Sequence, residues 1–333
     1  MKTGTEAQRQ KAQREKQRKS EPRMAGMTRI TEDESGKLME NSKIEWCDHT
    51  FNPWWGCQHA GSPGCDNCYA EAFARRLGID CFGLGKPRRV FGETHWAEPL
   101  RWNRAAEKAG KRAIVFSGSM CDIFEPVEMW SERWRLYDLI GRTPNLFWLL
   151  LTKRPENLGK MKPPHGFPEN VGLGVTVETQ DQVWRIYEML MHTASVYFVS
   201  HEPALSAIKW PDEFLKYGDT ALIITGGESG ENARPINPGW VLKDRDECVK
   251  SGVRFNFKQW GEWRPVLRGE SLNNLKIKII SWDGSEISLD NTVDPAWGDS
   301  VVAWAGKKHA GRMLVERVWD EMPEYIRIKP CSK

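Results

Sequence analysis

Short runs of apolar residues recur along the chain, and most of them lack the polar alternation of a half-buried strand. Runs of this length that are rich in β-branched residues are typical of strands buried in a parallel sheet. Segments with helical spacing separate several of them, as in residues 179–193, where Val183, Ile186 and Leu190 share one face. We expect strands at residues 44–46, 113–116, 147–151, 171–177, 196–199, 221–225 and 253–257.

The alternation of strands and helices predicts an α/β fold built from βα units with right-handed crossovers. Six or seven units favour an open or complete (β/α) barrel over a Rossmann sheet, and no GxGxxG motif follows an early strand. We expect three parts: a disordered basic tail at residues 1–42, the barrel at residues 43–265, and an appended C-terminal segment, rich in short β-strands, at residues 266–333.

Composition places the chain among intracellular globular proteins, because 28% of its residues are charged and the first residues carry no apolar signal segment. We expect no membrane partner and a cytoplasmic location. Residues 1–29 hold nine Lys and Arg against three Glu, a charge of +6, which leaves −3 for the remainder of the total of +3. This basic arm and the 17 tryptophans are compatible with a nucleic-acid partner, although a solvated, disordered tail is the simpler explanation of the arm.

Polar residues follow each expected strand at its C-terminal end, where barrel enzymes carry their active sites. We expect a functional face there, with Lys153, Glu178, His201 and Glu202 as catalytic candidates. The simpler alternatives are salt bridges at the barrel mouth for Lys153 and a hydrogen-bonded structural role for His201. Further polar groups at the same edge are Ser117, Ser119, Asp122, Arg154 and Glu228.

Three cysteines, Cys57, Cys65 and Cys68, follow the first expected strand with the spacing Cys-x7-Cys-x2-Cys. Clustered thiolates repel unless a cation neutralises them, so metal ligation suits them better than a disulfide in an intracellular protein. A structural zinc ion needs a fourth ligand, which Cys47, His49 or His59 could supply. A [4Fe–4S] cluster on three cysteines instead leaves one iron open, as the cleavage of S-adenosylmethionine (SAM) requires. The spacing leaves both alternatives open.

Several longer motifs carry a family resemblance: "IEWCDHTFNPWWGC", "SPGCDNCYAE", "LLLTKRPENL", "SHEP", "GGESG", "FKQWGEW" and "GKKHAGRMLVERVWDEMP". Over residues 43–323 the chain resembles a three-cysteine, radical-SAM-like family often encoded by bacteriophages, although radical SAM enzymes usually space their cysteines Cys-x3-Cys-x2-Cys. The resemblance implies a partial (β/α)6-type barrel with a [4Fe–4S] cluster on Cys57, Cys65 and Cys68. It also implies SAM contacts from Ser117, Gly118, Ser119 and Asp122, and a role for Gly226, Gly227 and Glu228 in holding the adenine or ribose end of SAM, or the substrate.

This resemblance implies a radical SAM enzyme that works with an external one-electron reductant in the cytoplasm of a bacterial host. The specific expectation is an isomerase acting on glycyl-bearing, modified thymidine during phage DNA hypermodification. A radical SAM lyase of DNA lesions and a zinc-stabilised DNA-binding protein are the alternatives.

Overall fold

The computed structural model describes residues 31–32, 38–39, 42, 44–288 and 298–328. The tail expected at residues 1–42 lies almost entirely outside them. Its described part includes two short paired strands, β1 (Thr31–Glu32) and β2 (Leu38–Met39).

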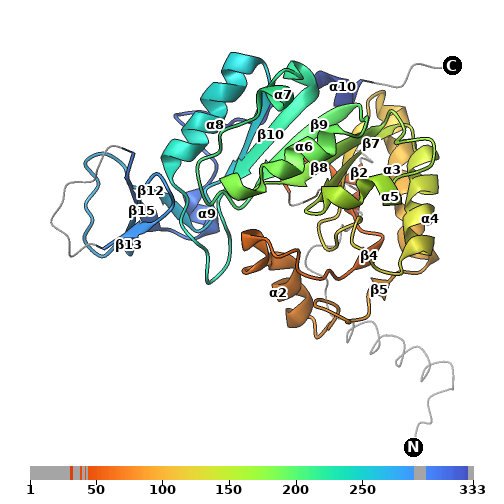
Figure 1. The fold of residues 1–333 in the computed structure, drawn as a ribbon, viewed down its shortest axis with the longest axis horizontal. Helices are drawn as coiled ribbons and strands as arrows, with labels where there is room; N and C mark the ends of the chain where they lie inside the picture. Colours follow the sequence, from red (N-terminus) through yellow and green to blue (C-terminus); the bar gives the residue numbers. More distant parts are fainter. Residues whose placement is uncertain (1–30, 33–37, 40–41, 43, 289–297, 329–333) are drawn as a thin grey trace, which may run out of the picture.

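The centre of the molecule is a parallel seven-stranded sheet that curls into a half-barrel, so the expected α/β class is confirmed (Figure 1). Neighbouring strands in the sheet are almost all consecutive parallel strands of the chain, which is the topology that βα units produce. In sheet order the strands are β11 (Arg254–Gln259), β10 (Ala221–Gly226), β9 (Val196–His201), β8 (Val171–Thr176), β7 (Leu146–Thr152), β6 (Ala113–Ser117) and β3 (His49–Phe51).

The first strand differs from the expectation. Residues 44–46 form a turn, and the strand that pairs with β6 is His49–Phe51. The apolar run at 44–46 has another cause, because Trp46 packs into the half-barrel with its ring centroid 4.5 Å from that of Phe116. Burial alone therefore explains the run that suggested a strand.

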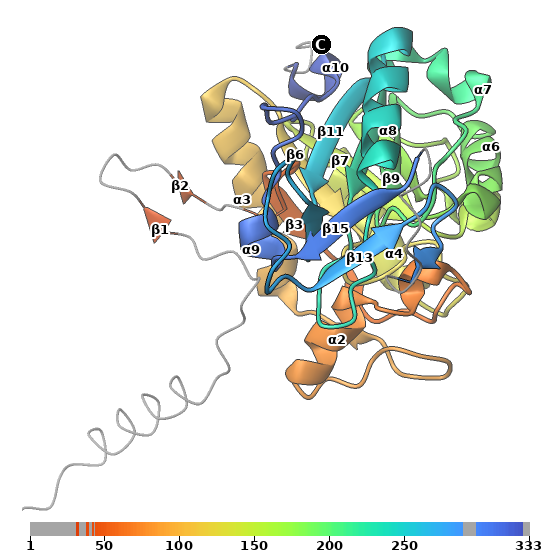
Figure 2. The same ribbon diagram turned by 90° about the vertical axis from the view of Figure 1, so that its left-hand side faces the viewer.

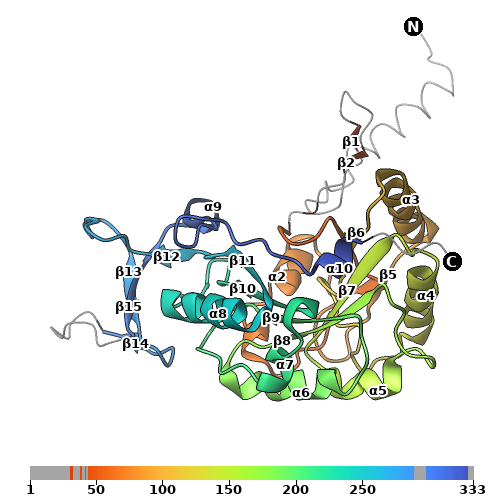
Figure 3. The same cartoon turned by 90° about the horizontal axis from the view of Figure 1, so that it is seen from above.

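Helices cover the outer side of the sheet in an arc (Figure 3). Helix α8 starts with Pro238 after the cap Asn237 and is closed by the cap Gly252, whose φ of 76° suits glycine. In α4, Leu136 and Ile140 are buried, while Trp130 and Trp134 are half-exposed. The helices between sheet strands are α3 (Glu93–Ala109), α4 (Trp130–Gly141), α5 (Leu158–Met161), α6 (Trp184–Leu190), α7 (Asp212–Leu215) and α8 (Pro238–Ser251), with 3₁₀ turns η2 (Pro155–Asn157), η3 (Gln180–Gln182) and η4 (Gly218–Thr220).

After β11 the chain forms a separate antiparallel sheet, which projects from the half-barrel in Figure 1 and lies in front of it in Figure 2. Its strands lie in the order β12 (Trp263–Pro265), β15 (Ser300–Trp304), β13 (Ile277–Ile280) and β14 (Glu286–Ile287), and α9 (Lys307–Ala310) follows. The chain then returns along β11, where Phe257 N donates to Trp319 O at 2.9 Å. Helix α10 (Glu324–Arg327) finally places Ile326 in the core of the inner face. This part of the segment is therefore built into the half-barrel.

The loop after β3 carries the remaining elements, which are β4 (Trp54–Trp55), η1 (Pro63–Cys65), α2 (Tyr69–Arg76) and β5 (Arg89–Val90). Strands β4 and β5 pair antiparallel beneath the C-terminal edge of the sheet. None of the helices in the described part of the chain is long and apolar enough to cross a membrane.

Candidate functional site

A pocket of about 410 Å³ opens at the C-terminal edge of the half-barrel, between the strand ends and the cysteine loop (residues 57–68). This volume suits a small-molecule ligand. The expected site residues divide between its wall and the layer behind it. Those on the wall are Cys57, Cys65, Cys68, Gly118, Ser119, Asp122, Lys153, Arg154, Glu202, Gly227 and Glu228, whereas Ser117, Glu178, His201 and Gly226 lie outside the lining.

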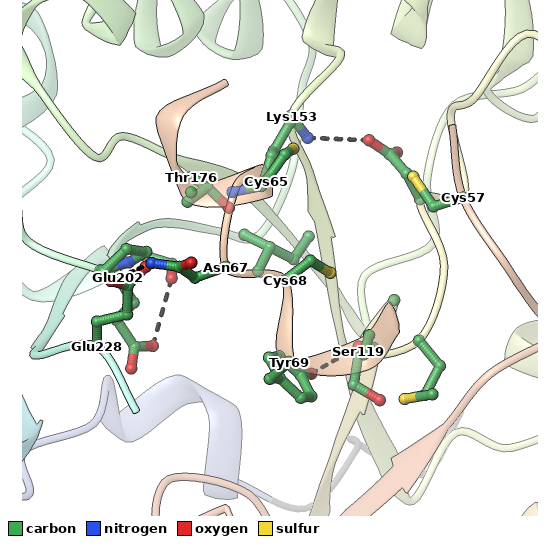
Figure 4. A pocket seen from close by; sticks show the side chains of 18 of the residues that line it. Cys57, Cys65, Asn67, Cys68, Tyr69, Ser119, Lys153, Thr176, Glu202 and Glu228 are labelled. Atoms are coloured by element: carbon green, nitrogen blue, oxygen red, sulfur yellow. Dashed lines mark hydrogen bonds between the residues drawn. The ribbon is translucent and has the colours of Figure 1, made fainter. Parts of the chain in front are cut away.

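The three cysteines of the loop are free thiols that share this wall. They lie with Lys153 on one side of the pocket, and Asn67, Glu202 and Glu228 lie on the other (Figure 4). Burial raises the pKa of the Cys57 thiol to about 12 and also raises the pKa of Cys68, so loss of these protons needs a compensating cation. Within the described residues, no group of three or more His, Cys, Asp and Glu side chains is arranged to hold a metal ion.

The sequence suggested three candidates for the fourth ligand of a zinc ion, and in the structure each of them contacts other residues. The Cys47 thiol donates to Ser42 Oγ at 3.3 Å, and Cys47 is not among the pocket-lining residues. His49 stacks on Trp102 with ring centroids 4.3 Å apart. His59 lies on the wall, and its Nε2 is 2.8 Å from the Glu71 carboxylate. A fourth thiol that does line the pocket is Cys121, whose pKa is raised well above its ordinary value by burial and by the neighbouring Cys57.

Glu178 is fully buried behind the wall, where it accepts hydrogen bonds from three partners. Lys153 Nζ lies 2.5 Å from Oε1, Arg185 lies 3.0 Å from Oε2, and Ser62 Oγ donates to Oε1 at 2.6 Å. Burial acts to raise the pKa of Glu178, but Lys153 and Arg185 outweigh it and hold that pKa below its usual value. Glu178 is therefore an anion that holds neighbouring elements together.

Asp122 joins the ends of β6 and β7. Its carboxylate accepts from Thr152 Oγ1 at 2.7 Å and from Arg154 at 3.0 Å. The same guanidinium lies 3.6 Å from Cys57 Sγ, so a cation stands beside one of the candidate ligands. The adjacent turn places Gly118 on the pocket wall with a φ of 103°, a conformation that suits glycine.

Ser119 completes this part of the wall. Its carbonyl accepts from Tyr69 Oη at 2.6 Å, and its hydroxyl accepts from Asn52 at 2.8 Å. These contacts tie the turn after β6 to the residue that follows the third cysteine.

Glu228 lies just after β10, and both of its carboxylate oxygens accept hydrogen bonds from other side chains. Arg234 donates to Oε1 at 2.6 Å and to Oε2 at 3.0 Å, and Asn67 Nδ2 donates to Oε2 at 3.0 Å. Gly227 packs so tightly that a Cβ there would lie 1.9 Å from Trp260 O. The Gly-Gly-Glu run therefore has a close-packing role and a role in holding the cysteine loop.

The two remaining catalytic candidates, His201 and Glu202, lie in different environments. His201 is fully buried, with Nδ1 2.7 Å from the Asp244 carboxylate. Glu202 faces the pocket, 2.8 Å from Lys258 Nζ. Burial acts to lower the pKa of Lys258, but Glu202 outweighs it and raises that pKa above its ordinary value. Glu202 and Lys258 thus form a charged pair on the wall opposite the cysteines.

Sequence reasoning assigned no role to Asn67, Arg185, Arg234 and Lys307. Asn67 and Arg234 tie the loop to β10, Arg185 pairs with Glu178, and Lys307 brings the C-terminal segment to the pocket. Asn67 and Lys307 do stand within the quoted motifs "SPGCDNCYAE" and "GKKHAGRMLVERVWDEMP", so their motif membership was a usable signal.

Residues 41–323 match the family described as protein of unknown function (DUF5131). The chain belongs to this family. No curated protein and no solved structure gives a significant match to the chain.

Proposed function

We propose that this member of the DUF5131 family is a radical SAM enzyme in which Cys57, Cys65 and Cys68 hold one [4Fe–4S] cluster. The observation that carries the proposal is the position of three free thiols on one pocket wall. They follow the first strand of a parallel half-barrel and face the C-terminal ends of its other strands. The donor set suits such a cluster in kind and number, because [4Fe–4S] clusters are held by cysteine thiolates and three of them leave one iron open for SAM.

When bound, the cluster and SAM would supply a 5′-deoxyadenosyl radical that takes hydrogen from an unactivated carbon. The chain's own residues provide the surroundings for that chemistry. Arg154 and Lys153 place positive charge beside the thiols, which favours their thiolate form. Trp46 and Phe116 form an apolar part of the wall, which limits the access of water.

We propose further that the substrate is a glycyl-bearing thymidine in phage DNA, which the enzyme isomerises with electrons from an external reductant. The motif resemblance supports this choice, and so does the charge on the wall. Lys307 lines the pocket, where it suits an anionic substrate, whereas Lys258 on the same wall is paired with Glu202. The same residues would serve a radical SAM lyase of DNA lesions.

The first prediction is that anaerobic reconstitution loads about four iron atoms per chain and produces a broad absorbance at about 400 nm. With dithionite and SAM, the loaded protein should form 5′-deoxyadenosine. Cys57→Ala should lose the cluster because it removes one ligand, whereas Cys121→Ala should keep it. Stoichiometric zinc without iron absorbance, and no 5′-deoxyadenosine, would contradict the proposal and favour a zinc-stabilised DNA-binding protein.

Nucleoside mass spectrometry of phage DNA made without this gene tests the substrate. Accumulation of an N-linked glycyl thymidine supports isomerisation. An unchanged nucleoside profile counts against it and leaves lesion repair as the radical SAM activity.

A further inference from the structure

The seven residues between Cys57 and Cys65 cross the edge of the sheet and are attached to it at several points. Three buried or nearly buried glutamates provide the anchors: Glu125, Glu178 and Glu228. They lie in the segments that follow β6, β8 and β10, which are alternate strands of the sheet. Each glutamate pairs with an arginine, namely Arg88, Arg185 and Arg234.

The first anchor holds the start of the loop. Gln58 N donates to Glu125, whose carboxylate is fixed by Arg88 at 2.7 Å. The carbonyl of Gln58 accepts hydrogen bonds from Arg154 and from the Cys57 thiol. The backbone next to the first cysteine is therefore bound on both its donor and its acceptor side.

The second anchor holds the middle of the loop. Ser62, only 2% exposed, donates to Glu178 Oε1 at 2.6 Å, and Arg185 lies 3.4 Å from the same hydroxyl. Gly64 passes so close that a Cβ there would lie 2.5 Å from Glu178 Oε1. Any larger residue at position 64 would push the loop off this anchor.

The third anchor holds the end of the loop. Asn67, which stands between the second and third cysteines, donates to Glu228 at 3.0 Å and to Asn232 O at 3.0 Å. Arg234 donates to Pro63 O at 2.9 Å while it also binds Glu228.

The length of the loop matches this path. From β6 to β10 there are four strand spacings, or about 19 Å along the sheet. The nine steps from Gln58 to Asn67 can reach about 30 Å, whereas a loop four residues shorter, as in Cys-x3-Cys-x2-Cys, reaches about 17 Å. The longer first gap therefore gives one loop enough length to reach all three anchors and still turn at η1.

We propose that residues 58–67 form a brace, held by the three glutamate–arginine pairs, that positions the three thiols before any cofactor binds and shields the bound cluster afterwards. Ser62, Asn67, Glu178 and Glu228 are positioning residues in this scheme. The shielding half of the inference rests on the function proposed above, whereas the rigidity of the empty brace does not.

The test uses the double variant Ser62→Ala/Asn67→Ala, which removes hydrogen bonds at two anchors without leaving a glutamate unpaired. The matched control is Ser251→Ala/Asn103→Ala, whose hydrogen bonds lie in α8 and between α3 and residue 145. In the metal-free protein, hydrogen exchange of peptides covering residues 57–68 should become about tenfold faster in the double variant and stay unchanged in the control. After reconstitution, iron loss to EDTA should accelerate similarly.

If the double variant lowers the urea midpoint, and so destabilises the whole protein, Ser62→Ala alone replaces it. Hydrogen exchange and iron loss are then measured on that single variant. Exchange at the wild-type rate in the metal-free variants overturns the brace. If wild-type protein binds no cluster, the proposed function fails, and the exchange rates still decide whether the brace exists.

Discussion

Individual histidines of this protein are held neutral by their surroundings, and His49 is the clearest example. It lies in β3 and stacks almost parallel on Trp102, with an interplanar angle of 5°. Burial lowers the pKa of His49 from 6.5 to about 4, although neighbouring Asp48 acts in the opposite direction. Between pH 6.5 and about 4, His49 therefore stays neutral in the folded protein but is protonated in the unfolded chain.

This difference predicts acid sensitivity. Above pH 6.5, His49 is neutral in both the folded and the unfolded protein, so it does not reduce the free energy of unfolding. As the pH falls from 6.5 toward about 4, His49 takes up a proton in the unfolded chain before it does so in the folded protein, and the free energy of unfolding decreases. The loss should approach about 2–3 kcal/mol. His49→Phe keeps the ring stack and should flatten the pH dependence of the free energy of unfolding, measured with urea from pH 7 to pH 4. Equal slopes in wild type and variant would contradict the assignment.

Strand β8 shows how an element's composition follows from its place in the sheet. Its alternate residues Val171, Leu173 and Val175 face the outer helices, and the glycines at 172 and 174 face the concave side. The concave side is narrow, and large side chains from β7 and β9 already fill it. A Cβ on Gly174 would lie 2.2 Å from the ring of Phe198.

Gly174→Ala should therefore destabilise the protein by about 1–3 kcal/mol, because the ring of Phe198 must leave its position. The control is Gly159→Ala in α5, whose Cβ would meet its nearest described atom at 3.6 Å and which improves helix propensity. Urea unfolding monitored by tryptophan fluorescence gives both values. A neutral effect at 174 would mean that the inner face has spare room.

At the scale of the whole molecule, the C-terminal segment contributes to the core as well as to the pocket. Residues 319–321 hydrogen-bond along β11, and Arg112 N donates to Arg327 O at 3.4 Å beside β6. The end of the segment thus links the last strand of the half-barrel to one of its first. Ile326 is fully buried there, whereas Ile328 is 56% exposed.

Ile326→Ala should lower the free energy of unfolding by about 2–4 kcal/mol, although it lies near the end of the chain. Ile328→Ala removes the same atoms from an exposed position and should be nearly neutral. Coincident unfolding transitions by fluorescence and circular dichroism would show that segment and half-barrel unfold together. A separate early transition in Ile326→Ala would contradict that integration.

The sequence alone determined the parallel α/β architecture, because doubly buried strands must be continuously apolar and their helices must carry period-3.6 stripes. Six of the seven expected strands lie within a residue or two of their predicted bounds. It also indicated the edge of the sheet that carries the pocket and the loop with three thiols, since both follow from what comes after each strand.

Tertiary structure decided what lies far apart in the chain but close in space. It moved the first strand to His49–Phe51, because an apolar run reports burial whether or not the backbone is extended. It placed His201 and Glu178 behind the wall and turned Glu228 toward Asn67. Local patterns cannot predict such pairings, because they depend on which strand ends the curl of the sheet brings beneath the loop. The seven-residue gap after Cys57 was visible in the sequence, but its three anchors became apparent only in the folded chain.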